Sequence, residues 1–330
     1  MTQPASGSRC LLILPRSFYG FAGVLSGALE ARGYVTTVAN DEYPESTFGK
    51  IISKLGMSLS HRLTRRALIE RVLRGHYYDL ILVIKGRGLD ASTAALLRQY
   101  GAVVVGYHFD AFAFDRGPLR WLSQVERVCT FDYRDAQTKG LPLVELFTSL
   151  PPLPIRPTRR YIVSVVMRNH SQRLAYVDQV LRSLDDAGLQ GERFIYILEA
   201  NVFSFLANLV RHPLLYWKYR CHIFRQALPY ADYVAAIADS EYTVDYAHPR
   251  QTGITIRCFE ALSAGTRVIT NNASVRRSPW FGAEHAVVVA PGETAGVLAA
   301  LLAALPPGPP QARRRGVDSF LRELLDPAMI

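Results

Sequence analysis

The chain has 330 residues and a formal net charge of +10, with 20% charged and 49% hydrophobic residues. This is an ordinary globular composition, and at about 150 residues per domain the length predicts two domains, each with its own core. The positive charge predicts anionic partners: nucleotide phosphates, acidic lipid headgroups or nucleic acid.

Nothing in the sequence indicates a metal, a disulfide or a membrane span. The four cysteines, Cys10, Cys129, Cys221 and Cys258, are far apart and form no CxxC pair, so we expect reduced core thiols in a cytoplasmic protein. There is no signal-peptide pattern and no uncharged run of ~20 residues. Because no Asp-x-Asp pair occurs, neither a metal nor another cofactor is expected.

The first half of the chain alternates apolar runs with amphipathic ones. Strands are expected at residues 10–14, 34–38, 78–84, 101–110 and up to 131, and helices at 21–32 and 91–100. The loop at 15–20, which holds Arg16, lacks the spacing of a dinucleotide fingerprint. A long basic segment at 48–75 could lie on an anionic membrane or pack on the sheet as a solvated helix.

Charged side chains follow two of these expected strands. Lys85 and Arg87 come after one strand, and His108 and Asp110 end the next. Because ligands bind beyond the carboxyl ends of parallel strands, these four residues should converge there, although solvated strand ends often look the same. Asp132, like Asp135 beside it, is expected to cap the following helix.

A segment with four prolines, residues 149–160, predicts a linker, and a second alternation follows it. Strands are expected at 161–167, 192–200, 242–246 and 280–289, and helices at 174–184, 230–239, 291–305 and 312–325. After the first of these strands, Arg168, Ser171 and Arg173 could present donors to a phosphate; Ser171 could equally be only a helix cap.

Residues 203–228 mix aromatic with basic side chains. Such a mixture could serve a membrane interface or single-stranded nucleic acid. Nucleic acid is the weaker option, because no sheet platform is predicted around the segment.

The stretch at 248–272 carries the most specific pattern. At ~100° per residue, Gly253, Arg257, Glu260 and Ala264 share one face of a helix that Gly265 ends. A helix start beside a cation and a carboxylate suits an anionic ligand. The plain alternative is an exposed i,i+3 ion pair between Arg257 and Glu260.

Three segments carry a resemblance to a known family. They are DLILVIKGRGL, VVVGYHFDAFAFD with the following FDYRDAQ, and HPRQTGITIRCFEALSAGTRVITNN. With these the chain resembles GT-B glycosyltransferases of bacterial lipopolysaccharide and capsular polysaccharide synthesis. The resemblance implies two Rossmann-like, doubly wound α/β domains facing a cleft, at residues 1–150 and 151–330; the last helix could pack back on the first domain.

The resemblance also implies roles for individual residues. The second domain would bind a nucleotide-sugar donor, with Glu260 on the ribose hydroxyls and Arg257 on the diphosphate, and the first would bind a lipid-linked or saccharide acceptor. Further donor contacts are expected from His248, Gln251, Thr252, Gly253, Arg168, Ser171 and Arg173. For a reaction that inverts the configuration, Asp110 is the candidate general base, with His108 second. Lys85, Arg87 and Arg16 would line the acceptor side.

One departure leaves the stereochemistry open, because Thr252 stands where many retaining enzymes carry a glutamate. Two other functions fit the same architecture: a nucleotide-sugar epimerase, and a noncatalytic, membrane-associated assembly subunit. We expect a cytoplasmic protein that could bind the inner face of the plasma membrane peripherally.

Overall fold

The computed structural model describes residues 7–15, 20–55, 58–199 and 201–326. The chain divides into two compact units. The first comprises residues 1–149, 250–253 and 316–330, and the second comprises 150–249 and 254–315. Compared with a single boundary near residue 150, the first unit thus also includes a short loop and the C-terminal segment.

The first unit is built on a five-stranded parallel sheet in the order β2-β1-β3-β4-β5. Its strands are β1 (Ser8–Ile13), β2 (Tyr34–Ala39), β3 (Leu80–Ile84), β4 (Val104–His108) and β5 (Arg127–Thr130). Every residue of β3 and β4 is buried, which explains their continuous apolar sequence. The chain changes direction across the sheet between β1 and β3.

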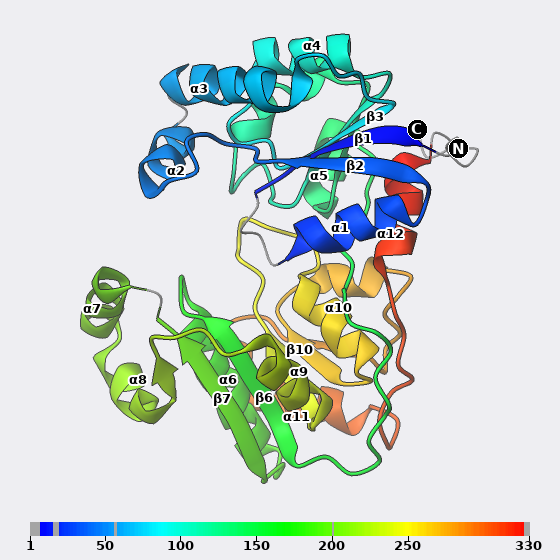
Figure 1. The fold of residues 1–330 in the computed structure, drawn as a ribbon. Helices are drawn as coiled ribbons and strands as arrows, with labels where there is room; N and C mark the ends of the chain where they lie inside the picture. Colours follow the sequence, from blue (N-terminus) through cyan, green and yellow to red (C-terminus); the bar gives the residue numbers. More distant parts are fainter. Residues whose placement is uncertain (1–6, 16–19, 56–57, 200, 327–330) are drawn as a thin grey trace. The chain divides into compact units, whose positions relative to one another are not determined.

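Helices flank this sheet (Figure 1). They are α1 (Phe21–Glu30), α2 (Thr47–Lys54), α3 (Ser58–Leu68), η1 (Ile69–Leu73), α4 (Ala91–Tyr100), η2 (Gly117–Arg120), η3 (Leu122–Gln124), α5 (Tyr133–Lys139) and α12 (Val317–Leu325). The C-terminal helix α12 lies within this unit. Phe320 of α12 packs edge-on against Tyr107 with ring centroids 4.8 Å apart, and Arg127 donates to the carbonyl of Glu323 at 2.9 Å.

The second unit has a six-stranded parallel sheet in the order β11-β10-β9-β6-β7-β8. Its strands are β6 (Tyr161–Arg168), β7 (Glu192–Leu198), β8 (Ile223–Phe224), β9 (Ser240–Asp245), β10 (Arg267–Thr270) and β11 (Ala286–Val288). From β6 the chain runs to one edge through β7 and β8, then returns to place β9 on the other side of β6. The switch point of this sheet therefore lies between β6 and β9.

The helices of this unit are α6 (Arg173–Asp186), α7 (Val202–Arg211), α8 (Pro213–Lys218), η4 (Arg220–His222), α9 (Tyr230–Ala238), α10 (Ile256–Ser263), η5 (Ala273–Arg277) and α11 (Ala295–Ala303). Helices α6 and α11 pack together, as do α9 and α10 (Figure 1). The core is formed by Val163, Val165, Val177, Leu181 and Ile269, all at most 2% exposed.

Four expectations need correction. The basic segment at 48–75 is not one helix, because α2, α3 and η1 divide it. Gly253 does not belong to the helix of Arg257 and Glu260, which begins only at Ile256. The strand expected at 280–289 is reduced to Ala286–Val288. Cys221 is exposed, whereas the other three cysteines are buried.

The expected end of helix α10 can be compared with the backbone. Gly265, in the left-handed region at φ 60°, follows α10, and the N–H of Thr266 donates to the Ala261 carbonyl at 2.9 Å. The expected glycine stop is therefore confirmed. Within the described ranges, no helix is both long enough and apolar enough to cross a lipid bilayer.

Candidate functional site

Several of the residues expected to bind the donor lie at the switch point of the second sheet, whereas Gln251, Thr252 and Gly253 belong to the first unit. Arg168 ends β6 and Arg173 begins α6, while Asp245 ends the neighbouring strand β9. Because β6 and β9 are parallel neighbours, their carboxyl ends open at the same edge of the sheet. Strand β10 pairs with β9 on the side away from β6. Just after β10, the Asn271 amide accepts from the N–H of Ala247 at 2.7 Å and donates to its carbonyl at 3.0 Å, which fixes the chain that follows β9.

Glu260 lies on α10 with its carboxylate held by two phenols. Tyr230 donates to one oxygen at 2.9 Å and Tyr233 donates to the other at 2.5 Å. Both tyrosines come from α9, which packs beside α10. Glu260 is only 4% exposed, and burial raises the pKa of its carboxyl group, although the two tyrosines and the charge of Arg257 oppose that shift. An exposed ion pair with Arg257 is therefore not what the structure shows.

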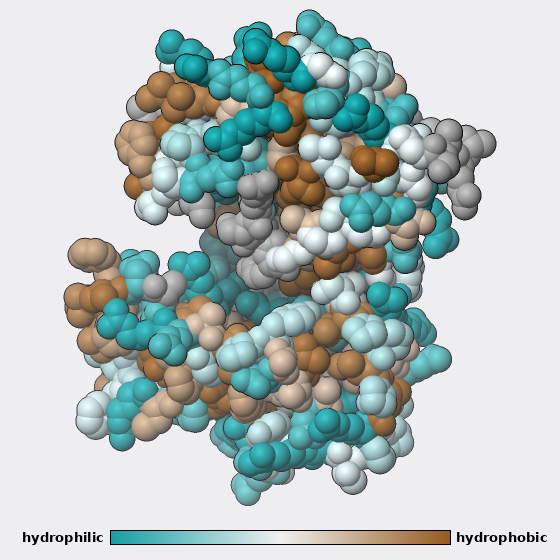
Figure 2. All heavy atoms as spheres, in the orientation of Figure 1, coloured by the Kyte–Doolittle hydropathy of each residue, from teal (hydrophilic) through white to brown (hydrophobic). Residues whose placement is uncertain are grey.

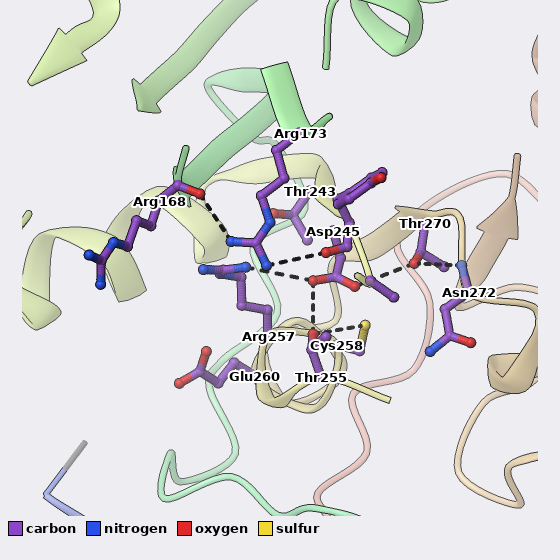
Figure 3. Close-up of polar contacts among 12 residues, drawn as sticks. Arg168, Arg173, Thr243, Asp245, Thr255, Arg257, Cys258, Glu260, Thr270 and Asn272 are labelled. Atoms are coloured by element: carbon purple, nitrogen blue, oxygen red, sulfur yellow. Dashed lines mark hydrogen bonds and ion pairs between the residues drawn. The ribbon is translucent and has the colours of Figure 1, made fainter. Parts of the chain in front are cut away.

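Arg257 instead extends toward Asp245 (Figure 3). Its guanidinium lies 3.8 Å from the Asp245 carboxylate, which is buried and also accepts a 2.8 Å hydrogen bond from Thr255, the residue before α10. A second hydroxyl, that of Thr270, reaches the other oxygen of Asp245 at 3.4 Å. The ends of β9 and β10 thus fix the start of the helix that carries Arg257 and Glu260.

Positive charge accumulates around this point. Arg173 donates to the carbonyl of Arg168 at 3.0 Å, and Figure 3 shows its side chain pointing to the same place as that of Arg257. The ring of His170 lies 6.1 Å from that of His248. Burial lowers the pKa of His170 to about 4, and Arg173, His248, Arg168 and Arg257 add to that shift. A neutral histidine among arginines marks a place where an anion would be stabilised.

Ser171 does not cap α6. The cap position is Gln172, without a side-chain hydrogen bond, and the Ser171 hydroxyl donates to the carbonyl of His170 at 2.6 Å. Ser171 instead has a left-handed backbone at φ 55°, which a non-glycine residue rarely adopts. The capping explanation is therefore wrong, and the turn after β6 holds strain of the kind found at ligand sites.

The loop before α10 is held by Asp132 within the first unit. Asp132 caps α5, as predicted, by accepting from the N–H groups of Arg134 and Asp135 at 3.0 and 3.1 Å. Its other oxygen accepts from the N–H groups of Thr252 and Gly253 at 2.5 and 3.0 Å. These two loop N–H groups are therefore bound to a protein carboxylate, and the expected contacts of Thr252 and Gly253 with the donor do not come from them.

Gly253 is needed for this close approach. A Cβ on it would lie 2.2 Å from the ring of Phe131, which is buried. Asp135, in contrast, was expected to cap the helix, and its carboxylate instead accepts from the N–H of Phe112 at 2.7 Å. Thr252 also donates its hydroxyl to Asp132 at 2.8 Å, so it serves the loop rather than standing free for a sugar.

The charged residues at the strand ends of the first unit do converge. Lys85 forms an ion pair with Asp110 at 2.8 Å, and both side chains are largely buried. Lys85 has a left-handed backbone at φ 66°, another strained non-glycine position. Gln251 donates to the other oxygen of Asp110 at 3.4 Å.

His108 and Arg87 both contact Asp115. Arg87 pairs with its carboxylate at 3.2 Å, and Nε2 of His108 lies 3.2 Å from its carbonyl oxygen. His108 is 1% exposed, and burial lowers the pKa of its imidazole to about 4. It is therefore neutral and shielded, which makes it a poorer base candidate than Asp110. Arg16 lies outside the residues that the structure describes.

A buried acid beside these residues gives a pH prediction. Asp41 follows β2 and is 1% exposed, and the N–H of Arg87 donates to one of its oxygens at 3.2 Å. Burial raises the pKa of Asp41 to about 7, and the neighbouring charge of Glu42 raises it further. The folded state thus binds a proton more tightly than the unfolded state, whose Asp pKa is ~3.9. Stability should therefore fall as pH rises from about 4 to about 7.

Asp41→Asn should remove that loss and raise the free energy of unfolding at pH 8 by about 1–2 kcal/mol, measured by urea denaturation. The amide keeps the acceptor for Arg87 but adds a donor, which limits the gain. Glu30→Gln, at an exposed site of α1, should leave the pH profile unchanged. If the wild type is equally stable at pH 5 and pH 8, Asp41 ionises normally.

Solved structures share this two-sheet architecture. The glycosyltransferase AviGT4, involved in avilamycin A biosynthesis, superposes with a TM-score of 0.54 at 14% identity, covering 96% of this chain and 98% of that one. An α-glucosyltransferase in complex with UDP and a 13-mer DNA gives 0.58 at 10% identity, with 96% and 95% covered. The chain has the GT-B fold. UDP-GlcNAc 2-epimerase from Methanocaldococcus jannaschii shares it, with a TM-score of 0.52, 12% identity and 96% and 99% covered.

No protein-family model matches the chain, and no curated protein matches its sequence. At these identities the structural similarity establishes the GT-B fold alone. In the described part of this GT-B chain, no group of three or more His, Cys, Asp or Glu residues could hold a metal.

Sequence reasoning missed several residues that the GT-B fold brings to the site. Tyr230 and Tyr233 look like ordinary aromatic residues of an apolar helix, yet both hold Glu260. Asp245, the last residue of the buried strand β9, was not identified as a site residue. Its signal was available, because Asp245 ends a predicted strand next to the switch point, where polar side chains usually have a ligand or a partner.

Proposed function

We propose that the protein is a glycosyltransferase, which moves a sugar from a nucleotide-sugar donor to a lipid-linked or oligosaccharide acceptor in bacterial surface polysaccharide synthesis. The observation that carries this proposal is the buried carboxylate of Glu260 next to the arginine and histidine cluster at the switch point of the second sheet. The proposed setting is the cytoplasm. The GT-B fold supports the proposal, since solved neighbours with this fold include glycosyltransferases.

The donor would be bound by the second unit. A carboxylate has about four lone-pair directions, and the two phenols use two of them, so Glu260 keeps capacity for two adjacent ribose hydroxyls. Arg257, with Arg173, Arg168 and His248, would neutralise the diphosphate as it leaves. Ser171 lies at the same turn. Without a metal, these side chains would do the main electrostatic work of the reaction.

The acceptor would be bound by the first unit. In the proposed step, the acceptor hydroxyl oxygen forms a bond to the anomeric carbon, and the bond from that carbon to the diphosphate oxygen breaks. Asp110 takes the hydroxyl proton, and the electron pair of the broken bond leaves with the nucleoside diphosphate. Lys85, with Arg87, would orient the acceptor, and Lys85 already holds the Asp110 carboxylate.

The first experiment is a thermal-shift panel of nucleoside diphosphates and CMP. A specific ligand raises the apparent melting temperature by mass action, so the donor nucleotide should stand out from the others. Uridine diphosphate is the first to test, because a neighbour of this fold is in complex with it. If no nucleotide shifts the melting temperature even at millimolar concentration, the proposed donor site is wrong.

Asp110→Asn should lower the rate of sugar transfer about a hundredfold, because the amide cannot accept the hydroxyl proton. Its affinity for the nucleotide should stay within about twofold, since Asp110 is assigned to the acceptor and not to the donor. Transfer is measured by nucleotide release with and without acceptor. Glu126→Gln, which removes a carboxylate paired with the exposed Arg98 in the same unit, is the control for a loss of charge and should keep transfer near the wild-type rate. Full transfer by a folded Asp110→Asn protein would rule out this base.

The epimerase neighbours favour a second candidate function. A nucleotide-sugar epimerase would change the configuration of the sugar without needing an acceptor. Incubation with UDP-GlcNAc followed by sugar analysis separates the two, because an epimer formed without acceptor supports the epimerase. A protein that binds the nucleotide but does neither reaction would be the noncatalytic assembly subunit.

A further inference from the structure

Helices α7 and α8 carry an exposed stripe of large apolar side chains. The stripe consists of Phe203, Leu206, Val210, Leu214 and Trp217. Phe203, Val210 and Leu214 are 82–85% exposed and Trp217 is 70% exposed. The spacing 203, 206, 210 follows one face of α7, and 214, 217 follows one face of α8. We call these five residues the outer stripe.

The opposite side of the same helices is fastened to the second unit. Phe205 and Leu209 pack against its core. Tyr216 is buried and donates to the carboxylate of Glu199, which also accepts from Asn208 at 3.2 Å. Each helix therefore already packs one face on the second unit, and the outer stripe is a separate, outward face of the same helices.

The segment that carries the outer stripe has charged side chains of one sign only. Residues 201–228 contain no Asp or Glu, and they carry Arg211, Lys218, Arg220 and Arg225. Arg220 lies over the ring of Trp217 at 4.5 Å and donates to its carbonyl at 2.9 Å. Lys218 pairs with Asp178 at 2.6 Å, so the remaining positive charges of the segment are the three arginines.

We propose that the outer stripe docks on an anionic lipid bilayer, with its apolar side chains in the interface and its arginines on the lipid phosphates. Apolar residues on one face, basic residues beside them and a tryptophan at the edge are what an interfacial helix needs. Anionic lipid attracts each nearby basic residue, and the segment has no acidic residue to oppose that attraction. Figure 2 shows apolar side chains of this segment at the surface of the second unit.

The test is sedimentation of the full chain with phospholipid vesicles, either of phosphatidylcholine alone or with about 30% phosphatidylglycerol. The wild type should partition onto the anionic vesicles at least about tenfold more strongly. Trp121 is already buried, and the part-buried Trp280 is replaced by Phe for this measurement. Emission from Trp217 should then shift to shorter wavelength on binding. Raising the salt concentration should weaken binding, because the charge component is screened.

Two sets of substitutions separate the contributions. Phe203→Ser with Val210→Ser and Leu214→Ser should lower partitioning at least about tenfold without lowering the melting temperature, since all three side chains are exposed. Arg211→Glu with Arg225→Glu should abolish the preference for anionic lipid. Tyr77→Ser, at a 57% exposed site of the first unit, is the matched control and should change nothing.

Two outcomes would overturn the proposal. If the serine variant binds vesicles as well as the wild type does, another surface holds the membrane, for example the basic helices α2 and α3. If the wild type ignores vesicles but forms dimers that the serine variant does not form, the outer stripe binds a second copy of the chain.

Discussion

Glu260→Ala is expected to weaken binding of the donor nucleotide by about two to three orders of magnitude, and sugar transfer with it. A hydrogen bond to a charged group contributes about 1.5–3 kcal/mol, and the proposed site loses two such bonds to the ribose. The substitution also leaves the hydroxyl of the buried Tyr233 without its acceptor, so some loss of stability is expected. Binding is measured by calorimetry with the nucleoside diphosphate that gives the largest thermal shift.

The ribose itself provides the sharpest control for Glu260. The 2′-deoxy form of the nucleotide should bind the wild type about tenfold or more weakly than the ribose form. Glu260→Ala should bind the two forms about equally, because it has lost the group that distinguishes them. Tyr230→Phe removes one phenol from the same carboxylate and should cost only a few-fold. If the alanine variant is folded and still prefers the ribose form, Glu260 does not bind the ribose.

Nucleotide affinity should also depend on pH through the carboxylate of Glu260. Because burial raises the pKa of Glu260, its charge and the bonds that depend on it are lost at a higher pH than for an ordinary glutamate. The affinity of the wild type should therefore begin to fall while an exposed glutamate, with a pKa of ~4.3, is still ionised. Titration of the phosphate affects every variant, so Glu260→Gln is the reference that isolates the contribution of the carboxylate.

Sequence patterns located the GT-B elements well where local chemistry decides the structure. The buried runs of β3 and β4 were found because a strand covered on both faces must be apolar throughout. Helix α4 was found to the residue, because Asp90 caps its start and Gly101 follows its end. Gly265 likewise marks the end of α10 through its positive φ.

Patterns failed where tertiary partners decide the structure. Gly253 fits the helical spacing of Arg257 and Glu260, yet its N–H donates to Asp132, 121 positions earlier in the chain. No local pattern can show such a partner, so the helix was extended too far toward the N-terminus. Ser171 looked like a helix cap for the same reason, because its left-handed backbone is not visible in the sequence.

The roles of the site residues could be inferred only in part. Arg257 and Glu260 were found from their spacing on one helix, and the alternative of an exposed ion pair between them is not what the structure shows. Their actual partners are Asp245 and the two tyrosines of α9. A single helix shows which residues share a face; the sheet order decides which strand ends lie beside that face.

Asp132→Ala is expected to lower the free energy of unfolding by roughly 3–5 kcal/mol. Loss of the α5 cap costs about 0.5–2 kcal/mol, and each buried donor left without an acceptor costs about 1–3 kcal/mol. Asp132 is 1% exposed and accepts from four N–H groups and the hydroxyl of Thr252. Urea denaturation of the full chain, followed by circular dichroism, measures the change.

Asp90→Ala is the matched control, because Asp90 caps α4 but holds no distant loop. It should cost only about 1 kcal/mol, the usual value of an N-cap. Asp132→Asn should rescue little, since an amide places its NH2 group against N–H donors that need an acceptor. Similar losses from Asp132→Ala and Asp90→Ala would mean that the loop bonds add nothing. A larger loss for Asp132 would show that this carboxylate fixes the loop leading to Arg257 and Glu260.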